Sequence, residues 1–424
     1  KQSSRRPPAS FVVTSEGMVH ALDGNDQLIW IVNLEKVVAD SNDDDENNNE
    51  DDGGATMTVD EPNQRRSRWF YAASFLQESS PDHLTGGDYD GIMGMDLASG
   101  RGLHITCLSH AGYVVSVSID ETNALSSKGG NIEEGSECIG IFENGLECGG
   151  WSPDGEVLAL VTFASGADEA GNASISFNGT EAKVPILMTM NTQYEILSEV
   201  RMDPCLFSLH SNDSVGHLPP NNISLCWRPD SSSLAVSTMD ANFSHTALRR
   251  IRTYHRTTLQ ILSLSKEEDG SGRDVPNLLP VAPTWAPAGC SHYVGAVQSS
   301  RSLTMKSAGN RHVPIQVAFM EPNGLRHREC KIHNSLPAKT DKEDILCISF
   351  NLEGDLLAVA STVTRNDPAS SSDQPYGKLQ LYHRSNFHWY LKYELRFDGH
   401  HSTTPSSVIS RIKFSDNDPY HITI

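Results

Sequence analysis

The chain has 424 residues, of which 38% are hydrophobic and 21% are charged, and its formal net charge at neutral pH is −21. This length and composition suit two or three domains, or one large β architecture with a substantial core. The negative charge argues against a dedicated nucleic-acid-binding domain, which needs a basic surface, and the chain lacks the run of about 18 apolar residues that would span a membrane.

The first predicted elements are short strands. Phe11–Val13, Met18–Leu22 and Gln27–Trp30 show the alternation with a period of two that is typical of strands. Tyr113–Val117 and Ile186–Met190 predict further strands in the same way. No window of about 12 or more residues keeps the period of a helix. The chain is therefore predicted to be nearly all β.

One pattern recurs along the chain: an aromatic residue, a turn rich in Pro, Asp, Asn or Gly, and then an alternating apolar strand. The aromatic residues of four clear copies and a weak fifth are Trp151, Trp227, Trp285, Phe350 and Phe414. We interpret each copy as a hairpin, in which the aromatic residue ends one strand and turn residues such as Pro153 and Asp154 lead into the next.

These repeats predict the blades of a WD40-like β-propeller. The copies lie farther apart than the about 40–50 residues of a bare blade, so the blades must carry insertions. We expect a disordered acidic insertion at residues 40–62. Mobile loops rich in Gly, Ser, Asn or charge are expected near residues 126–137, 164–182, 266–273, 299–310 and 365–374. Without the insertions, roughly seven blade-sized units remain.

The predicted domain organisation follows from the repeats. The propeller is expected to occupy residues 1–400, and residues 401–424 are expected to form a strand that crosses into, or begins, a second propeller. Because the last residues, 421–424, again alternate apolar and polar, we expect the chain to be part of a longer protein.

The cysteines favour a reducing compartment. The eight cysteines are scattered and include no Cys-x-x-Cys pair, and several lie in strand-like apolar runs. Buried reduced thiols are the simplest interpretation. The basic start, Lys1–Ser10, is not followed by the apolar segment of a secretion signal. We therefore expect a cytoplasmic protein.

Two later segments resemble a known family. Val317–His327, which includes Asn323, Gly324, Leu325, Arg326 and His327, resembles a stretch in the first propeller of the largest subunit of the Elongator complex. Asn386–Leu395, which includes His388, Trp389 and Tyr390, is similar to an aromatic segment of that family. The resemblance covers roughly residues 85–424, and the long loops depart from the family pattern.

The resemblance implies a non-catalytic scaffold. Elongator modifies the wobble uridine of certain tRNAs, and its catalytic radical-SAM/acetyltransferase subunit is a different chain. The first propeller of the family packs against that subunit and against a second WD40 subunit. Homodimer formation and most tRNA contacts would belong to other regions of the full-length protein. The expected location is the cytoplasm, with the nucleus as a second compartment, and no membrane partner is implied.

Two other functions stay open on the residues alone. The chain could be the gating propeller of a prolyl-oligopeptidase-like peptidase that lacks its hydrolase domain, or a generic peptide-binding propeller. However, it has no Gly-x-Ser-x-Gly, phosphate-binding, dinucleotide-binding or His-Glu-x-x-His motif. We therefore expect no catalytic residue and no cofactor.

A metal site is not expected either. His327, Cys330 and His333 have a spacing that can place ligands on zinc. On a strand, however, residues three apart point to opposite faces, which prevents a shared site.

Two groups are candidates for partner binding. The basic–aromatic group Arg249, Arg250, Arg252, Tyr254 and Arg256 would either contact RNA phosphates or an acidic partner, or form a solvated strand face. The second group is His388, Trp389 and Tyr390, which would be either a binding hot spot or a core strand with Trp389 buried.

Overall fold

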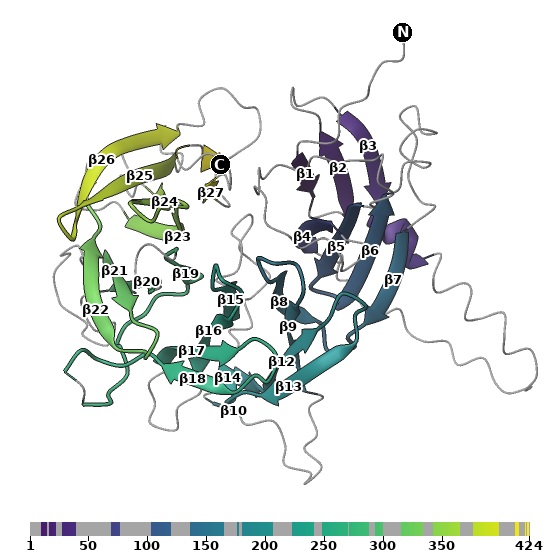
Figure 1. Ribbon diagram of the computed structural model, residues 1–424, viewed down its shortest axis with the longest axis horizontal. Helices are drawn as coiled ribbons and strands as arrows, with labels where there is room; N and C mark the ends of the chain where they lie inside the picture. The colour runs from purple at the N-terminus through teal and green to yellow at the C-terminus, as the bar shows by residue number, and fades with distance from the viewer. Residues whose placement is uncertain are drawn as a thin grey trace, which may run out of the picture. The chain divides into compact units, whose positions relative to one another are not determined.

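The computed structural model is almost entirely β (Figure 1). It describes residues 10–14, 17–22, 28–39, 69–76, 103–119, 136–164, 176–177, 180–206, 223–240, 248–269, 271–287, 293–299, 315–333, 342–364, 376–397, 412–414, 420 and 422–423. Residues 34–39 form a helix. Within the described ranges, no helix has the length and apolar character needed to cross a membrane. The all-β prediction is confirmed.

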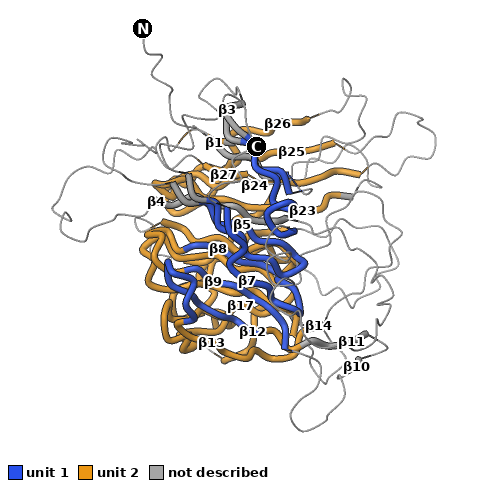
Figure 2. The backbone as a smooth tube through the Cα atoms, turned by 90° about the vertical axis from the view of Figure 1, so that its right-hand side faces the viewer, with its two compact units in different colours: residues 1–151, 158–165, 186–196 blue, residues 152–157, 166–185, 197–424 orange. Residues whose placement is uncertain are grey.

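The chain divides into two compact units (Figure 2). Unit 1 consists of Lys1–Trp151, Leu158–Ser165 and Ile186–Ile196, and unit 2 consists of Ser152–Val157, Gly166–Pro185 and Leu197–Ile424.

The strands of the N-terminal half form antiparallel sheets of three and four strands. The first sheet has the order β1 (Ser10–Val13), β2 (Met18–Leu22), β3 (Leu28–Asn33). The second has the order β4 (Trp69–Leu76), β5 (Leu103–Ser109), β6 (Tyr113–Ile119), β7 (Ser136–Ile141). The third has the order β8 (Leu146–Trp151), β9 (Leu158–Phe163), β12 (Pro185–Met190), β13 (Ile196–Arg201).

The next sheet is larger, because short strands extend its meander. Its meander consists of β15 (Ile223–Trp227), β16 (Ser233–Asp240), β17 (Leu248–His255) and β18 (Ile261–Leu264). The added strands are β10 (Ser176–Phe177), β11 (Thr180–Lys183) and β14 (Cys205–Leu206).

Two further four-stranded sheets and one hairpin complete the described β structure. One sheet has the order β19 (Thr284–Trp285), β20 (Val294–Ser299), β21 (Ile315–Met320), β22 (Arg326–Lys331). The other has the order β23 (Lys342–Phe350), β24 (Leu356–Thr364), β25 (Tyr376–Ser385), β26 (His388–Phe397). The hairpin pairs β27 (Lys413–Phe414) with β28 (Ile422–Thr423).

The repeated aromatic pattern is confirmed as a repeated hairpin. The aromatic residue is the last residue of β8, β15, β19, β23 and β27, and the next strand along the chain pairs antiparallel with it. Three of these turns contain a residue with positive φ, which is Gly155 after β8, Ser231 after β15 and Gly354 after β23. A left-handed residue lets the chain reverse within a short loop.

The turn at Asn323-Gly324 differs from a two-residue type I′ turn. Only Gly324 has a positive φ, of 85°. The backbone N–H of Gly324 donates to the carbonyl of Glu321 (2.8 Å), which describes a type I turn followed by a left-handed glycine. A Cβ at this glycine would lie 2.1 Å from the carbonyl oxygen of Leu264, so no other residue fits without backbone movement.

Several segments that were expected to be loops contain regular structure. The segment 164–182 contains β10 and part of β11, and β7 begins inside the segment 126–137. In the segment 266–273, the N–H of Glu267 donates to the carbonyl of Arg273 (2.7 Å). The segments 40–62 and 365–374, and residues 300–310, lie outside the described residues.

Each unit has its own apolar core. In unit 1, Trp151 packs with Leu108, Leu146, Leu158 and other buried residues. In unit 2, one cluster joins the sheets β19–β22 and β23–β26 through residues such as Phe319 and Phe350.

The terminal hairpin belongs to the same packing as unit 2. Ile412 and Phe414 are buried against Ala358, Ala360 and Leu379 of β24 and β25. The end of the described chain therefore contributes to the core of the sheet β23–β26.

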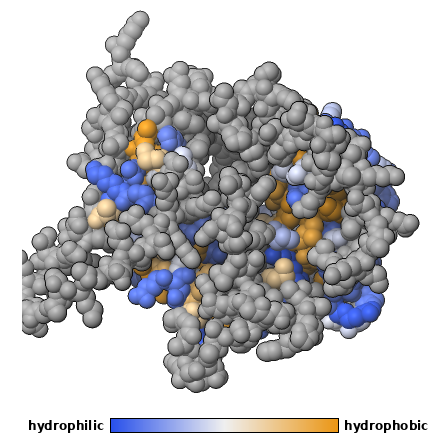
Figure 3. Space-filling model, turned by 180° about the vertical axis from the view of Figure 1, so that it is seen from behind, coloured by the Kyte–Doolittle hydropathy of each residue, from blue (hydrophilic) through white to orange (hydrophobic). Residues whose placement is uncertain are grey.

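Exposure rises toward the last strand of a sheet. In the sheet β23–β26, the strand β24 is almost fully buried, whereas β26 is largely exposed. Figure 3 shows hydrophobic residues reaching the surface between hydrophilic ones. Large apolar side chains exposed on the outer strands β13, β18 and β26 are Ile196, Leu197, Ile261, Leu262, Tyr390, Tyr393 and Leu395.

Candidate functional site

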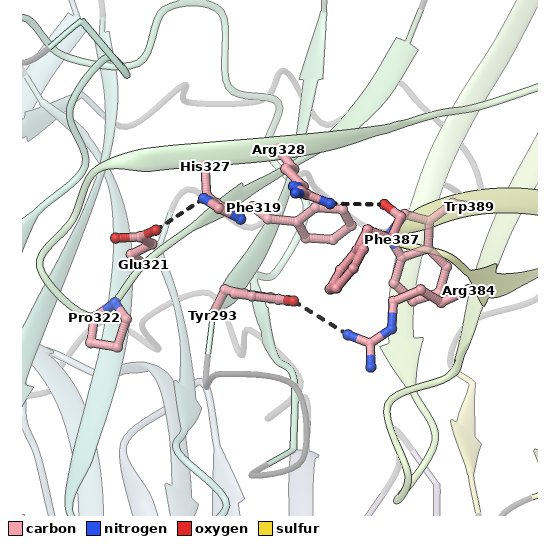
Figure 4. A pocket seen from close by; sticks show the side chains of 9 residues that line it. All are labelled: Tyr293, Phe319, Glu321, Pro322, His327, Arg328, Arg384, Phe387 and Trp389. Carbon is pink, nitrogen blue, oxygen red and sulfur yellow. Dashed lines mark hydrogen bonds and ion pairs between the residues drawn. The ribbon is translucent and has the colours of Figure 1, made fainter.

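A pocket of about 330 Å³ lies in unit 2 between the sheets β19–β22 and β23–β26 (Figure 4). Residues before β20, on β21 and β22, and around the β25–β26 turn form its walls. They are Tyr293, Phe319, Glu321, Pro322, His327, Arg328, Arg384, Phe387 and Trp389. This pocket brings residues of both family-like segments together.

Aromatic rings form much of its wall. Phe319 is buried and lies 5.8 Å from Trp389 and 5.7 Å from Tyr293 between ring centroids. Trp389 also lies 5.9 Å from Phe350 of the core. These separations are those of aromatic pairs that stabilise one another. Trp389 is thus half-buried against the core and also lines the pocket.

The β25–β26 turn presents a ring at the mouth of this pocket. Asn386 and Phe387 both have positive φ, of 49° and 66°. Two-residue hairpin turns with this conformation usually contain Asn-Gly, because positive φ is rare for a residue with a bulky side chain. The Phe387 residue is 73% exposed. The Arg328 guanidinium lies 5.0 Å from the ring centroid of Phe387 and donates a hydrogen bond to the Phe387 carbonyl (3.2 Å).

The charged groups of the pocket are two guanidiniums and the carboxylate of Glu321, which His327 contacts. Arg384 donates to the hydroxyl of Tyr293 (3.3 Å), and His327 Nδ1 lies 2.9 Å from a carboxylate oxygen of Glu321 (Figure 4). The His327 ring also stacks on Tyr293, with centroids 6.2 Å apart. Within the described part of the chain, neither Arg328 nor Arg384 forms an ion pair.

The other residues of the two family-like segments lie outside the pocket. Asn323 is exposed, and its side-chain oxygen accepts from the N–H of Leu325 (2.9 Å). Arg326 pairs with Glu329. On β26, His388 and Tyr390 are exposed and their rings meet edge to face. Among the three residues predicted as a hot spot, therefore, only Trp389 lines the pocket.

Four residues of the basic–aromatic group lie on β17 and Arg256 directly follows that strand, and carboxylates of the chain pair with Arg250, Arg252 and Arg256. Arg252 is 6% exposed and bonds Asp240 (2.6 Å) and Asp203 (2.5 Å). Arg250 bonds Asp240 (3.0 Å) and Asp274 (2.8 Å). Burial alone would lower the pKa of Arg252, but the hydrogen bond and charge of Asp240 raise it.

Two further members of this group, Arg249 and Tyr254, are buried like Arg252 rather than solvated. Arg249 is 2% exposed and donates to the hydroxyl of Ser237 (3.1 Å), and burial lowers its pKa to about 10. Tyr254 is 1% exposed, and burial raises its pKa to about 12. A solvated strand face is therefore not what the structure has. Alternation along β17 could not indicate that these side chains are buried, because the buried counter-charge, Asp240, comes from the adjoining strand β16.

The last member, Arg256, connects two turns of unit 2. It bonds Asp154 (2.7 Å) and Glu156 (2.8 Å) in the turn after Trp151. Partial burial opposes ionisation of Asp154, but hydrogen bonds from Ser152 and the Glu156 N–H, with the charge of Arg256, lower its pKa below 3.8. The predicted turn residue Asp154 thus also fixes Arg256.

The repeated tryptophans hold the sheets through their ring nitrogens as well as by burial. Trp151 Nε1 donates to the hydroxyl of Thr106 (2.9 Å), and the Trp285 nitrogen donates to the carbonyl of Cys226 (3.2 Å). Trp227 ends β15 and is partly buried. Their role in this structure is packing. No group of three or more metal-binding side chains occurs among the described residues.

Comparison with known proteins places this arrangement in a family. The model of the ELP1 first N-terminal β-propeller matches residues 36–218 and 209–414. Curated relatives are named Elongator complex protein 1. The one from Schizosaccharomyces pombe is 25% identical over 76% of this chain and 23% of the relative. The one from Rattus norvegicus is 26% identical over 64% of this chain and 18% of the relative. A third, from Saccharomyces cerevisiae, is 22% identical over 61% of this chain and 19% of the relative. The predicted β-propeller and the family resemblance are confirmed.

The matches also show how much of its relatives' length the chain spans. It covers about a fifth of the length of these curated relatives. Among solved structures, prolyl oligopeptidase B from Galerina marginata is similar with a TM-score of 0.31 at 11% identity, over 69% of this chain and 42% of that chain. A score this low carries no argument for the peptidase alternative.

Proposed function

The chain belongs to the ELP1 first N-terminal β-propeller family, and we propose that it acts as a non-catalytic scaffold within an Elongator complex. The observation that carries this proposal is the family match over nearly the whole chain, together with curated relatives named as Elongator subunits. The repeated sheets support it, because rigid antiparallel blades present broad surfaces to other chains.

The proposed mechanism is the rigid presentation of surfaces. The outer strands β18 and β26 carry exposed apolar side chains, such as Ile261 and Tyr393, and on β26 these lie beside charged ones. Apolar and aromatic side chains on a surface supply contact area for protein partners. The partners in this proposal are the catalytic radical-SAM/acetyltransferase subunit and the second WD40 subunit.

In this proposal, the chain supports tRNA wobble-uridine modification indirectly. The chemistry takes place on the catalytic subunit, and dimer formation and most tRNA contacts are made by other regions of the full-length protein. The net charge of −21 agrees with a minor role in RNA binding. The proposed location is the cytoplasm, with a nuclear fraction.

The tRNA part of the proposal can be tested by inactivating the gene in its own cells. Nucleosides from purified tRNA are then quantified by mass spectrometry. Wobble uridines that carry Elongator-type side chains should fall to background and return when the full-length gene is restored. Normal levels of these nucleosides in the inactivated cells would refute the proposal.

A further inference from the structure

The pocket between the sheets β19–β22 and β23–β26 combines an aromatic wall with two guanidiniums at its edge. We propose that it binds a linear segment of a partner protein, which inserts an aromatic or large aliphatic side chain and places a nearby carboxylate against Arg328 and Arg384. The volume of about 330 Å³ is at the lower end of ligand pockets, so one anchoring side chain fills it.

The charge of the pocket selects an acidic ligand. Arg328 donates to the Phe387 carbonyl and Arg384 donates to the Tyr293 hydroxyl, so both guanidiniums meet neutral oxygens. Elsewhere in unit 2, Arg250, Arg252 and Arg256 pair with carboxylates. Acidic residues outnumber basic ones by 54 to 33 in this chain. Two arginines that line one pocket without such partners in the described structure therefore favour a carboxylate from another chain.

Glu321 sets where that carboxylate can bind. It is the acidic residue of the pocket, and its carboxylate is joined to His327 (2.9 Å). Arg328 and Arg384 lie around Phe387 instead, on the other side of the pocket in Figure 4. The acidic group of the ligand therefore binds near Phe387, and the side of the pocket at Glu321 disfavours a second negative charge.

Phe387 gives an independent reason to expect a ligand. A bulky residue with φ of 66° is strained, and glycine would serve the same hairpin without that strain. With 73% of the residue exposed, the ring gains little from packing within the chain. An exposed ring held at the mouth of an aromatic pocket supplies the contact area that binding hot spots use.

A nucleic acid is the other ligand that aromatic rings and arginines can bind, by base stacking and phosphate contacts. The observations favour a peptide, because a nucleic acid would bring a phosphate with every nucleotide to a chain with a net charge of −21, whereas the proposed segment needs a single carboxylate, placed away from Glu321. This inference concerns the segment that a partner inserts. It does not depend on the Elongator assignment.

The test selects peptides with the 424-residue chain itself. A phage library of random heptapeptides is panned against the immobilised chain, and selected peptides are measured by fluorescence polarisation. The variants are Arg384→Gln and Phe387→Gly, which suits the turn conformation. The control is Lys392→Gln, which removes a positive charge from an exposed position on β26 outside the pocket.

The proposal expects selected peptides to share an acidic residue close to an aromatic or large aliphatic one. Their affinity should fall at least about ten-fold in both pocket variants, as for the loss of a charged hydrogen bond or an anchor contact, and stay within about two-fold in Lys392→Gln. Melting curves check that the variants fold. Failure to select peptides, selection of peptides without acidic residues, or equal binding to all variants would overturn it. Tighter binding of a single-stranded decanucleotide RNA that depends on Arg384 would assign the pocket to nucleic acid instead.

Discussion

The buried charges on β16 and β17 make a quantitative prediction for Asp240→Asn. The carboxylate of Asp240 bonds Arg252 at 2.6 Å and Arg250 at 3.0 Å, and the side chains of Asp240 and Arg252 are only 4% and 7% exposed. Asn keeps the shape and one acceptor oxygen but removes the negative charge. The guanidinium of Arg252 then stays buried, with Asp203, whose side chain is 64% exposed, as its remaining carboxylate.

Removing one partner of a buried pair costs about 3–5 kcal/mol of unfolding free energy. Because Asp203 remains and Asn still accepts a hydrogen bond, we expect the lower end, about 3 kcal/mol. The matched control is Asp274→Asn. Its partner Arg250 is 22% exposed and keeps Asp240, so the expected cost is about 1 kcal/mol or less.

Urea unfolding, monitored by tryptophan fluorescence and by circular dichroism, measures both variants. The double variant Asp240→Leu with Arg252→Met removes both charges and should be more stable than Asp240→Asn alone. A loss in Asp240→Asn that is no larger than the loss in Asp274→Asn would refute the argument that burial makes this pair costly to break.

Three further predictions follow from packing and burial. Trp389→Ala should lower the unfolding free energy by about 2–3 kcal/mol in urea titrations, less than for a fully buried Trp because this residue is only partly buried. An unchanged value would place this ring outside the core. In the folded chain the pKa of Asp154 lies below 3.8, so its contribution to stability is complete above that value and lost as the pH falls through the folded pKa. The stability difference between the parent and Asp154→Asn, measured by thermal melts, should therefore shrink from about pH 6 to about pH 3, and a constant difference would contradict the ionic role. Burial raises the pKa of the thiols of Cys107, Cys205 and Cys330 to about 12. Iodoacetamide at about pH 8 should therefore leave these thiols unmodified in the native chain, which peptide mass mapping measures. Rapid labelling of the native chain would contradict their burial.

Local patterns predicted much of the fold, because hairpin signals are local. An aromatic residue, a turn and an apolar strand lie within a few residues of one another, and each of the five copies forms the expected strand pair. Strand pairs that involve β10, β11 and β14 were missed. These strands have two to four residues, which is too short for a period of two to be recognised.

The candidate site was predictable only in part, since it depends on contacts between sheets. The family-like segments contain Phe319, Glu321, Phe387 and Trp389, but Arg384 and Tyr293 lie outside them and reach the pocket through tertiary packing. The sequence could have pointed to Phe387, because Asn386-Phe387 occupies a two-residue hairpin turn that usually contains Asn-Gly. The counter-charges of Arg252 and Arg256 could not be predicted for the same reason, as they come from a neighbouring strand and a distant turn.

The central claim is that the chain is part of a scaffold that holds other Elongator subunits. Its most direct test is affinity purification of the tagged full-length protein from its own cells, with partners identified and quantified by mass spectrometry. The account predicts a radical-SAM/acetyltransferase subunit and a second WD40 subunit in amounts close to that of the bait. Recovery of the protein alone, or of a preparation that cleaves Pro-containing peptides, would contradict it.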